Sequence, residues 1–109
     1  MFGFGARSAA KTLTPTQVRQ VGDAVTLVDV RENAEWASGH IAGAIHIPLG
    51  RLRGEMNHIP SDKPVVFYCQ AGGRSSQAIA IAKALGQSHD THLGGGIGAW
   101  RAQNFPVAS

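Results

Sequence analysis

Short apolar runs alternate along this chain with segments of helical pattern, and this alternation restricts the fold more than any other feature of the sequence. Helices are expected to start near residue 14 and to cover residues 32–38, 49–59, 75–85 and 97–103. Strands are expected at residues 25–30, 44–47, 65–68 and 91–93. Strands this short and apolar are typical of a parallel sheet buried between helices. The sequence therefore predicts an α/β domain with a mainly parallel sheet and helices on both faces.

The chain has 109 residues, which suits one compact domain. We expect residues 1–10 to form a flexible N-terminal tail and residues 11–109 to form a single domain. At the first helix, Thr14, Pro15 and Gln17 predict a capping box with proline at the first helical position.

The charge and the apolar pattern limit the classes of partner and compartment. The net charge is +3 without a run of Lys or Arg, which favours small anions over nucleic acid. No apolar run approaches the roughly 18 residues of a transmembrane helix, so no membrane partner is expected. A single cysteine cannot form an internal disulfide. We therefore expect a cytoplasmic protein.

The single cysteine, Cys69, stands at the end of the strand predicted at residues 65–68 and just before a predicted helix. Such a thiol lies among backbone N–H groups at a helix N-terminus, where the thiolate is favoured. The structural alternative is a small buried cysteine without chemistry. The following residues favour the reactive interpretation, and we take them as candidate binding residues: Gln70, Ala71, Gly72, Gly73, Arg74 and Ser75.

The glycines, the arginine and the serine of this loop are each expected to have a different role. Gly72 and Gly73 permit backbone angles that aim successive N–H groups inward, so a β-branched side chain at Gly73 is expected to distort the loop. Arg74 supplies a permanent positive charge that attracts an anionic donor. Ser75 is expected to cap the following helix through its hydroxyl.

Asp29 and Arg31 end the strand predicted at residues 25–30. Ligands of parallel sheets bind beyond the carboxyl ends of the strands, so this segment and the Cys69 loop are expected at one edge. Asp29 and Arg31 are therefore candidate supporting residues that brace the loop. A local ion pair and direct catalysis remain open alternatives.

We expect neither a metal nor a cofactor. The five histidines lack the spacing of a ligand set, and a structural or exposed role is favoured for each. Gly94, Gly95 and Gly96 have no Lys-Ser/Thr after them, so tight packing of a strand-to-helix turn is preferred to a phosphate loop.

Several motifs, in this order, resemble the signature of the rhodanese-like domain family over roughly residues 12–106. They are Asp29-Val30-Arg31-Glu32, Glu35-Trp36, the segment from Gly39 to Pro48, Tyr68-Cys69 with Gly72, Arg74 and Ser75, and Leu93-Gly94-Gly95-Gly96 with Ala99-Trp100. The resemblance implies a rhodanese-like three-layer α/β/α domain with a small, mainly parallel five-stranded sheet.

The resemblance also implies sulfur transfer, by a single-domain thiosulfate sulfurtransferase. The Cys69 thiolate would attack a donor such as thiosulfate, release sulfite and hold a persulfide until cyanide or a thiol removes the outer sulfur. The small anionic donor and the thiol or cyanide acceptor are thus the expected partners. A persulfide carrier or regulatory module that serves a protein acceptor is the alternative.

The length of the loop from Cys69 to Arg74 favours sulfur transfer over phosphatase or arsenate reductase activity. Four residues lie between Cys69 and Arg74, whereas related phosphatases and arsenate reductases have five. The shorter loop suits a sulfur atom and crowds a tetrahedral oxyanion. Phosphatase or arsenate reductase activity is therefore the weaker alternative, and Tyr68 in place of a histidine before the cysteine weakens it further.

Overall fold

The computed structural model describes residues 10–109, so the expected tail of residues 1–10 lies outside the described residues except for Ala10. Five strands, five α-helices and two short 3-10 helices follow one another in this part of the chain. In chain order they are β2 (Lys11–Leu13), α1 (Pro15–Val21), η2 (Gly22–Ala24), β3 (Thr26–Asp29), α2 (Asn33–Ala37), β4 (Ile45–His46), α3 (Leu49–Glu55), η3 (Met56–His58), β5 (Val65–Tyr68), α4 (Gly73–Ala84), β6 (Thr91–Leu93) and α5 (Gly96–Ala102).

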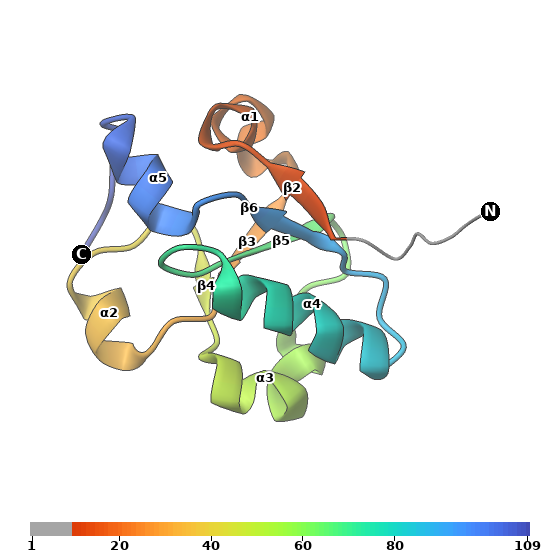
Figure 1. Ribbon diagram of the computed structural model, residues 1–109. Helices are drawn as coiled ribbons and strands as arrows, with labels where there is room; N and C mark the ends of the chain where they lie inside the picture. The colour runs from red at the N-terminus through yellow and green to blue at the C-terminus, as the bar shows by residue number, and fades with distance from the viewer. Residues whose placement is uncertain (1–9) are drawn as a thin grey trace.

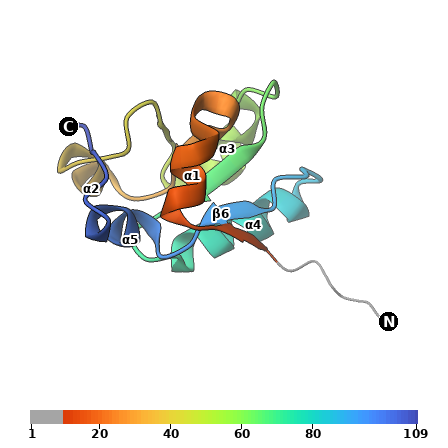
Figure 2. The ribbon, with the colours of Figure 1, turned by 90° about the horizontal axis from the view of Figure 1, so that it is seen from above.

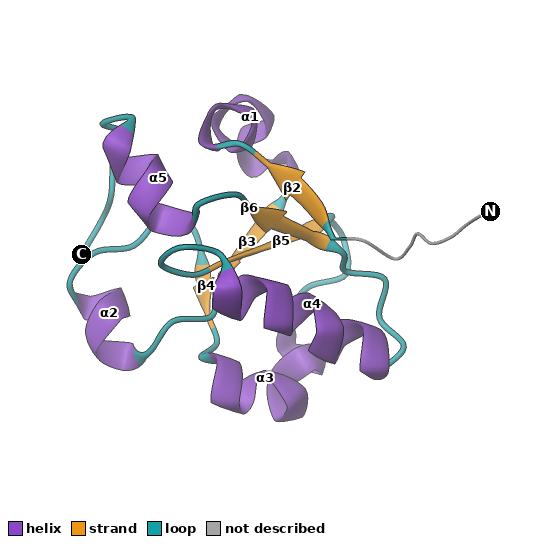
Figure 3. Ribbon diagram, viewed as in Figure 1, coloured by secondary structure: helices purple, strands orange, loops and turns teal. Residues whose placement is uncertain are grey.

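The strands form one sheet in the order β2-β6-β5-β3-β4, and every neighbouring pair is parallel. Helices α1 and α5 cover one face of the sheet, and α3 and α4 cover the other (Figures 1 and 3). The expected three-layer α/β/α architecture with a five-stranded sheet is confirmed, and the sheet is entirely parallel.

The two faces of the sheet bury separate apolar clusters, and β5 contributes to both because its side chains alternate. Val65 and Phe67 join the cluster under α3 and α4, together with Cys69 just beyond the strand. Val66 and Tyr68 join the cluster under α1 and α5. The thiol is therefore directed to the α4 side of the sheet.

The carboxyl ends of β5 and β3 meet at one edge of the sheet, since the two strands are parallel and adjacent. The Asp29 position pairs in register with Tyr68, which precedes the cysteine. At the same end of the molecule lie α2, α5 and the C-terminus (Figures 1 and 2). Residues that follow β3 and β5, together with residues of α2 and α5, can therefore contribute to one site at this edge.

Most predicted elements are present with shifted ends. The helix expected at residues 49–59 ends at Glu55 and continues as the 3-10 turn η3, and α4 begins at Gly73 rather than at residue 75. The capping box at Thr14 is confirmed, because Gln17 N–H donates to the Thr14 hydroxyl oxygen and Thr14 N–H donates to the Gln17 side chain.

Strand β2 is not one of the four strands whose positions were predicted from the sequence. Its residues Lys11 and Thr12 are exposed, and only Leu13 is apolar, so no buried pattern marks it. It is held as an edge strand by parallel pairing with β6.

No helix between residues 10 and 109 is long and apolar enough to cross a membrane.

Candidate active site

The Cys69 sulfur lies at the bottom of the turn that joins β5 to α4. The N–H of Gly72 donates to Cys69 Sγ at 3.0 Å, and the N–H of Ser75 donates to it at 3.4 Å. Gly72 has φ +125°, a conformation that a residue with a side chain rarely adopts. The cysteine is almost fully buried, whereas Gln70 and Ala71 are exposed on the outer side of the turn.

The surroundings favour the thiolate form of Cys69. Burial raises the pKa of the thiol, because a charged sulfur is poorly solvated there. The N–H groups of Ser75 and Gly72, the Ser75 hydroxyl and the N–H of Ala71 together outweigh that effect, so the net pKa lies below its ordinary value. The start of α4, a helix of 12 residues, adds its positive dipole end.

Two expectations about this loop were wrong. Gly73 is the first residue of α4 and does not have a positive φ, so only Gly72 of the two glycines needs an unusual backbone. A β-carbon on Gly73 would meet no atom within 4 Å. Ser75 lies inside the first turn of α4 rather than capping it, and its hydroxyl oxygen lies 3.1 Å from the carbonyl oxygen of Gly72. Gly72 holds the N-cap position because it provides the required turn.

Arg74 is paired with a carboxylate, which the sequence argument did not anticipate. Its two terminal nitrogens donate to the two oxygens of Glu35 at 2.6 and 2.8 Å. The hydrogen bond from Arg74 lowers the pKa of Glu35 to about 2. Because Glu35 neutralises it, Arg74 adds little net positive charge for a donor; instead it fastens α4 to α2.

Asp29 and Arg31 form a buried ion pair. The Arg31 side chain donates to both Asp29 oxygens, and its Nη2 also donates to the carbonyl of Gly39 at 2.7 Å. Burial lowers the pKa of Arg31, but the hydrogen bond and charge of Asp29 raise it to above its ordinary value. These contacts are those of the local ion pair, with a link to Gly39, and bracing of the Cys69 loop stays a prediction.

The start of α5 supports the active loop from below. Its N–H groups at Ile97 and Gly98 donate to the carbonyls of Cys69 and Gln70 at 2.9 and 3.0 Å. Gly96 has φ +61°, and a β-carbon there would overlap the carbonyl of Cys69. The expectation that the glycines at residues 94–96 serve tight packing is thus confirmed at Gly96.

His92 is a site residue that the sequence argument assigned to a structural or exposed role. The residue is 9% exposed, and its Nδ1 lies 2.8 Å from the hydroxyl of Ser75, which itself contacts the sulfur. The residue stands 17 positions after Ser75 in the chain, so no local motif connects the two.

The rings of His40 and His46 stack against Trp36 with centroid separations of 3.5 and 4.7 Å. Among residues 10–109, no group of three or more His, Cys, Asp and Glu side chains is arranged to hold a metal ion.

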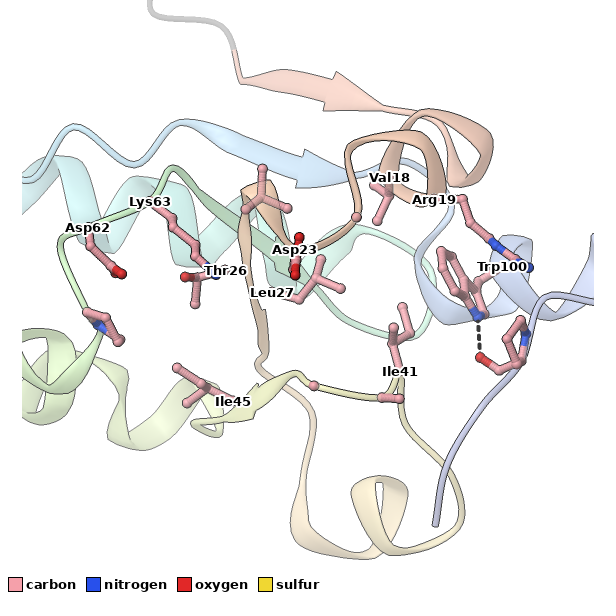
Figure 4. Close-up of a pocket in the computed structure, with 16 residues that line it drawn as sticks. Val18, Arg19, Asp23, Thr26, Leu27, Ile41, Ile45, Asp62, Lys63 and Trp100 are labelled. Atoms are coloured by element: carbon pink, nitrogen blue, oxygen red, sulfur yellow. Dashed lines mark hydrogen bonds between the residues drawn. The ribbon is translucent and has the colours of Figure 1, made fainter.

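A separate groove of about 520 Å³ lies on the α1 side of the sheet. Figure 4 shows Trp100 and Arg19 at one end, Asp62 and Lys63 at the other, and Ile41 along the wall. None of the residues of the Cys69 loop lines it, so the groove is distinct from the candidate active site.

Comparison with known proteins places this geometry in a family. The family described as "Rhodanese-like domain" matches residues 14–103. The chain is 42% identical over 108 residues to the probable adenylyltransferase/sulfurtransferase MoeZ of Mycobacterium tuberculosis, covering 93% of this chain but only 28% of that protein. It is 32% identical over 100 residues to the thiosulfate sulfurtransferase GlpE of Ectopseudomonas mendocina, covering 91% of each.

A solved structure agrees with these relatives. The crystal structure of a rhodanese-related protein from Thermoplasma volcanium superposes with a TM-score of 0.82 at 30% identity. The match covers 90% of this chain and 97% of that one.

Proposed function

Because the chain belongs to the rhodanese-like domain family, we propose that it is a sulfurtransferase that moves a sulfane sulfur from thiosulfate to cyanide or a thiol through a persulfide on Cys69. The observation that carries the proposal is the sulfur itself, which accepts two backbone N–H groups at the start of α4. The names of relatives such as GlpE support the same reaction class.

The first half of the reaction follows from the thiolate. The Cys69 sulfur attacks the outer sulfur of thiosulfate, a sulfur–sulfur bond forms to Cys69, and the bond to the sulfonate group breaks with release of sulfite. No electrons are gained or lost overall, and the persulfide retains one negative charge. The N–H groups that favour the thiolate also favour this anion, because both place negative charge in the same cradle.

In the second half, an acceptor removes the outer sulfur. Cyanide attacks it, the sulfur–sulfur bond breaks, and thiocyanate leaves with the Cys69 thiolate restored. A thiolate acceptor reacts in the same way and becomes a persulfide. None of the 109 residues other than Cys69 is a cysteine, so this sequence offers no second thiol as the acceptor.

The turnover assay is thiocyanate formation from thiosulfate and cyanide. Wild-type protein is expected to form thiocyanate, and Cys69→Ser is expected to lose this activity while remaining folded. Ser76→Ala, an exposed substitution on the same helix, is the matched control and should remain active. Hydrolysis of an aryl phosphate without thiocyanate formation would instead favour the phosphatase alternative.

One observation favours a second candidate, a persulfide carrier that serves a protein. Glu35 neutralises Arg74, so the loop offers little charge to attract a small dianion. In MoeZ, the matching segment is about a quarter of a larger protein. Slow turnover with thiosulfate, combined with rapid transfer from a persulfidated protein, would favour the carrier.

A further inference from the structure

A chain of polar side chains leads from the Cys69 sulfur to the protein surface. The hydroxyl oxygen of Ser75 lies 3.7 Å from Cys69 Sγ and 2.8 Å from His92 Nδ1. The other ring nitrogen, Nε2, lies 3.3 Å from Thr12 Oγ1. Cys69, Ser75 and His92 are buried, whereas Thr12 is exposed on the edge strand β2. The contacts therefore connect a buried thiol to solvent.

The ring of His92 can carry a hydrogen bond through this chain in either direction. Burial lowers the pKa of His92, which keeps the ring neutral near pH 7. A neutral imidazole has one donor and one acceptor nitrogen, and the two tautomers exchange these roles. Each tautomer of His92 therefore determines which partner donates in its hydrogen bond with Ser75 and in its hydrogen bond with Thr12.

With a Cys69 thiol, S–H donates to the Ser75 oxygen, Ser75 O–H donates to His92 Nδ1, and Nε2–H donates to Thr12. With a Cys69 thiolate, every bond reverses: Thr12 O–H donates to Nε2, Nδ1–H donates to Ser75, and Ser75 O–H donates to the sulfur. The carbonyl of Gly72, 3.1 Å from the Ser75 oxygen, is the competing acceptor.

We propose that Ser75, His92 and Thr12 form a proton path between the Cys69 sulfur and solvent. The thiol proton passes to Ser75 as the Ser75 proton passes to Nδ1. The Nε2 proton passes to Thr12 as the Thr12 hydroxyl proton leaves to water. Four bonds to hydrogen break and four form, one proton reaches solvent, and the thiolate remains. The path rests on the proposed function only in that sulfur transfer begins from this thiolate.

The charged groups near the path are paired with other residues, so Cys69 is the group whose ionisation drives the reversal of the hydrogen bonds. On the α4 side, Arg74 is engaged by Glu35. Beside β6, Asp90 forms an ion pair with Lys11 and accepts a hydrogen bond from the hydroxyl of Thr91. Opposite His92 in the sheet register stands an apolar residue, Phe67 of β5.

The direct test is the tautomer of His92, followed by nitrogen NMR of protein labelled with ¹⁵N while the pH is raised through the ionisation of Cys69. The path predicts Nε2–H below the Cys69 pKa and Nδ1–H above it. In Cys69→Ala, the tautomer should stay the same over that pH range. One tautomer throughout in the wild type, or the same exchange in Cys69→Ala, would overturn the proposal.

A pair of substitutions tests the link at Ser75 by a second readout, the ultraviolet absorbance of the thiolate. Ser75→Ala is expected to raise the Cys69 pKa by about one unit, since a charge-assisted hydrogen bond is lost. It should also uncouple the His92 tautomer from Cys69. The control Thr91→Val, on the same strand as His92 but outside the path, should leave both unchanged. An unchanged pKa in Ser75→Ala would contradict the path.

Neither measurement needs a sulfur donor. Failure of the path would therefore leave thiocyanate formation intact, and failure of sulfur transfer would leave the tautomer exchange observable.

Discussion

At the scale of single residues, the charged groups around the candidate site are compensated within hydrogen-bond distance. Glu35 binds Arg74 of the loop, and Asp29 binds Arg31 at the end of β3. The Cys69 sulfur alone relies on N–H groups and a hydroxyl instead of a charged partner. The sulfur therefore has no charged partner that would have to be displaced before it reacts.

The Glu35 carboxylate should give the protein a pH-dependent contribution to stability. Its pKa is about 2 in the folded protein, below its ordinary value of 4.5, mainly because Arg74 binds the charged form. The contribution is therefore complete above about pH 4.5 and is lost as the pH falls towards 2. Both side chains are about one-third exposed, so we expect less than about 1 kcal/mol at neutral pH.

Urea unfolding of wild type and Glu35→Gln over this pH range measures the effect. The glutamine oxygen can still accept the N–H of Glu32, whereas the charge and one of the two hydrogen bonds from Arg74 are lost. The difference in unfolding free energy between the two proteins should shrink as the pH is lowered. A difference that stays constant from neutral to acid pH would contradict the assignment.

A larger effect on the unfolding free energy is expected for the buried ion pair of Asp29 and Arg31. Asp29→Asn leaves the Arg31 guanidinium buried without a countercharge, which is expected to cost about 3–5 kcal/mol of unfolding free energy. Asp90→Asn removes one partner of the exposed pair with Lys11 and should cost about 0–1 kcal/mol. Chemical denaturation compares the two, and equal losses would argue against a bracing role for Asp29.

At the scale of elements, the site depends on how closely α5 approaches the β5–α4 loop. The N–H groups at the start of α5 hold the carbonyls of Cys69 and Gln70, and the backbone of Gly96 lies against the same carbonyls. This element therefore fixes the loop from the side opposite α4.

Gly96→Ala tests that approach. The new β-carbon would overlap the loop backbone and would occupy a positive φ, so we expect a loss of about 1–3 kcal/mol in stability. Thiocyanate formation should fall as well, because the loop must shift. Gly54→Ala in α3 is the matched control: its β-carbon meets nothing within 4 Å, and alanine should stabilise the helix by up to about 1 kcal/mol. An active, stable Gly96→Ala protein would refute the close approach.

The elements also show what sequence can and cannot predict. Strands β3 and β5 were located because apolar and β-branched residues form short continuous runs there, whereas β4 and β6 each carry a histidine beside a single apolar residue. Strand β2 carries two exposed residues out of three, and only its pairing with β6 makes it a strand. Its Thr12 then becomes part of the proposed proton path, so a missed element also concealed a site residue.

At the scale of the whole molecule, the sheet order determines which distant residues meet. The Cys69 loop is contiguous in sequence and was predictable, since its turn, glycines and helix start are local signals. The Arg74–Glu35 contact spans 39 positions, and the Thr12–His92 contact spans 80. These pairings depend on the parallel order of β2, β6, β5 and β3, which no local pattern encodes.

The central claim is that Cys69 holds a persulfide, and the mass of the intact protein tests it most directly. After incubation with thiosulfate and removal of excess reagent, wild-type protein should gain the mass of one sulfur atom, and cyanide should remove it. Cys69→Ser should gain nothing under the same conditions. An unchanged wild-type mass, with Cys69 shown by alkylation to be a free thiol, would contradict transfer from thiosulfate through this residue.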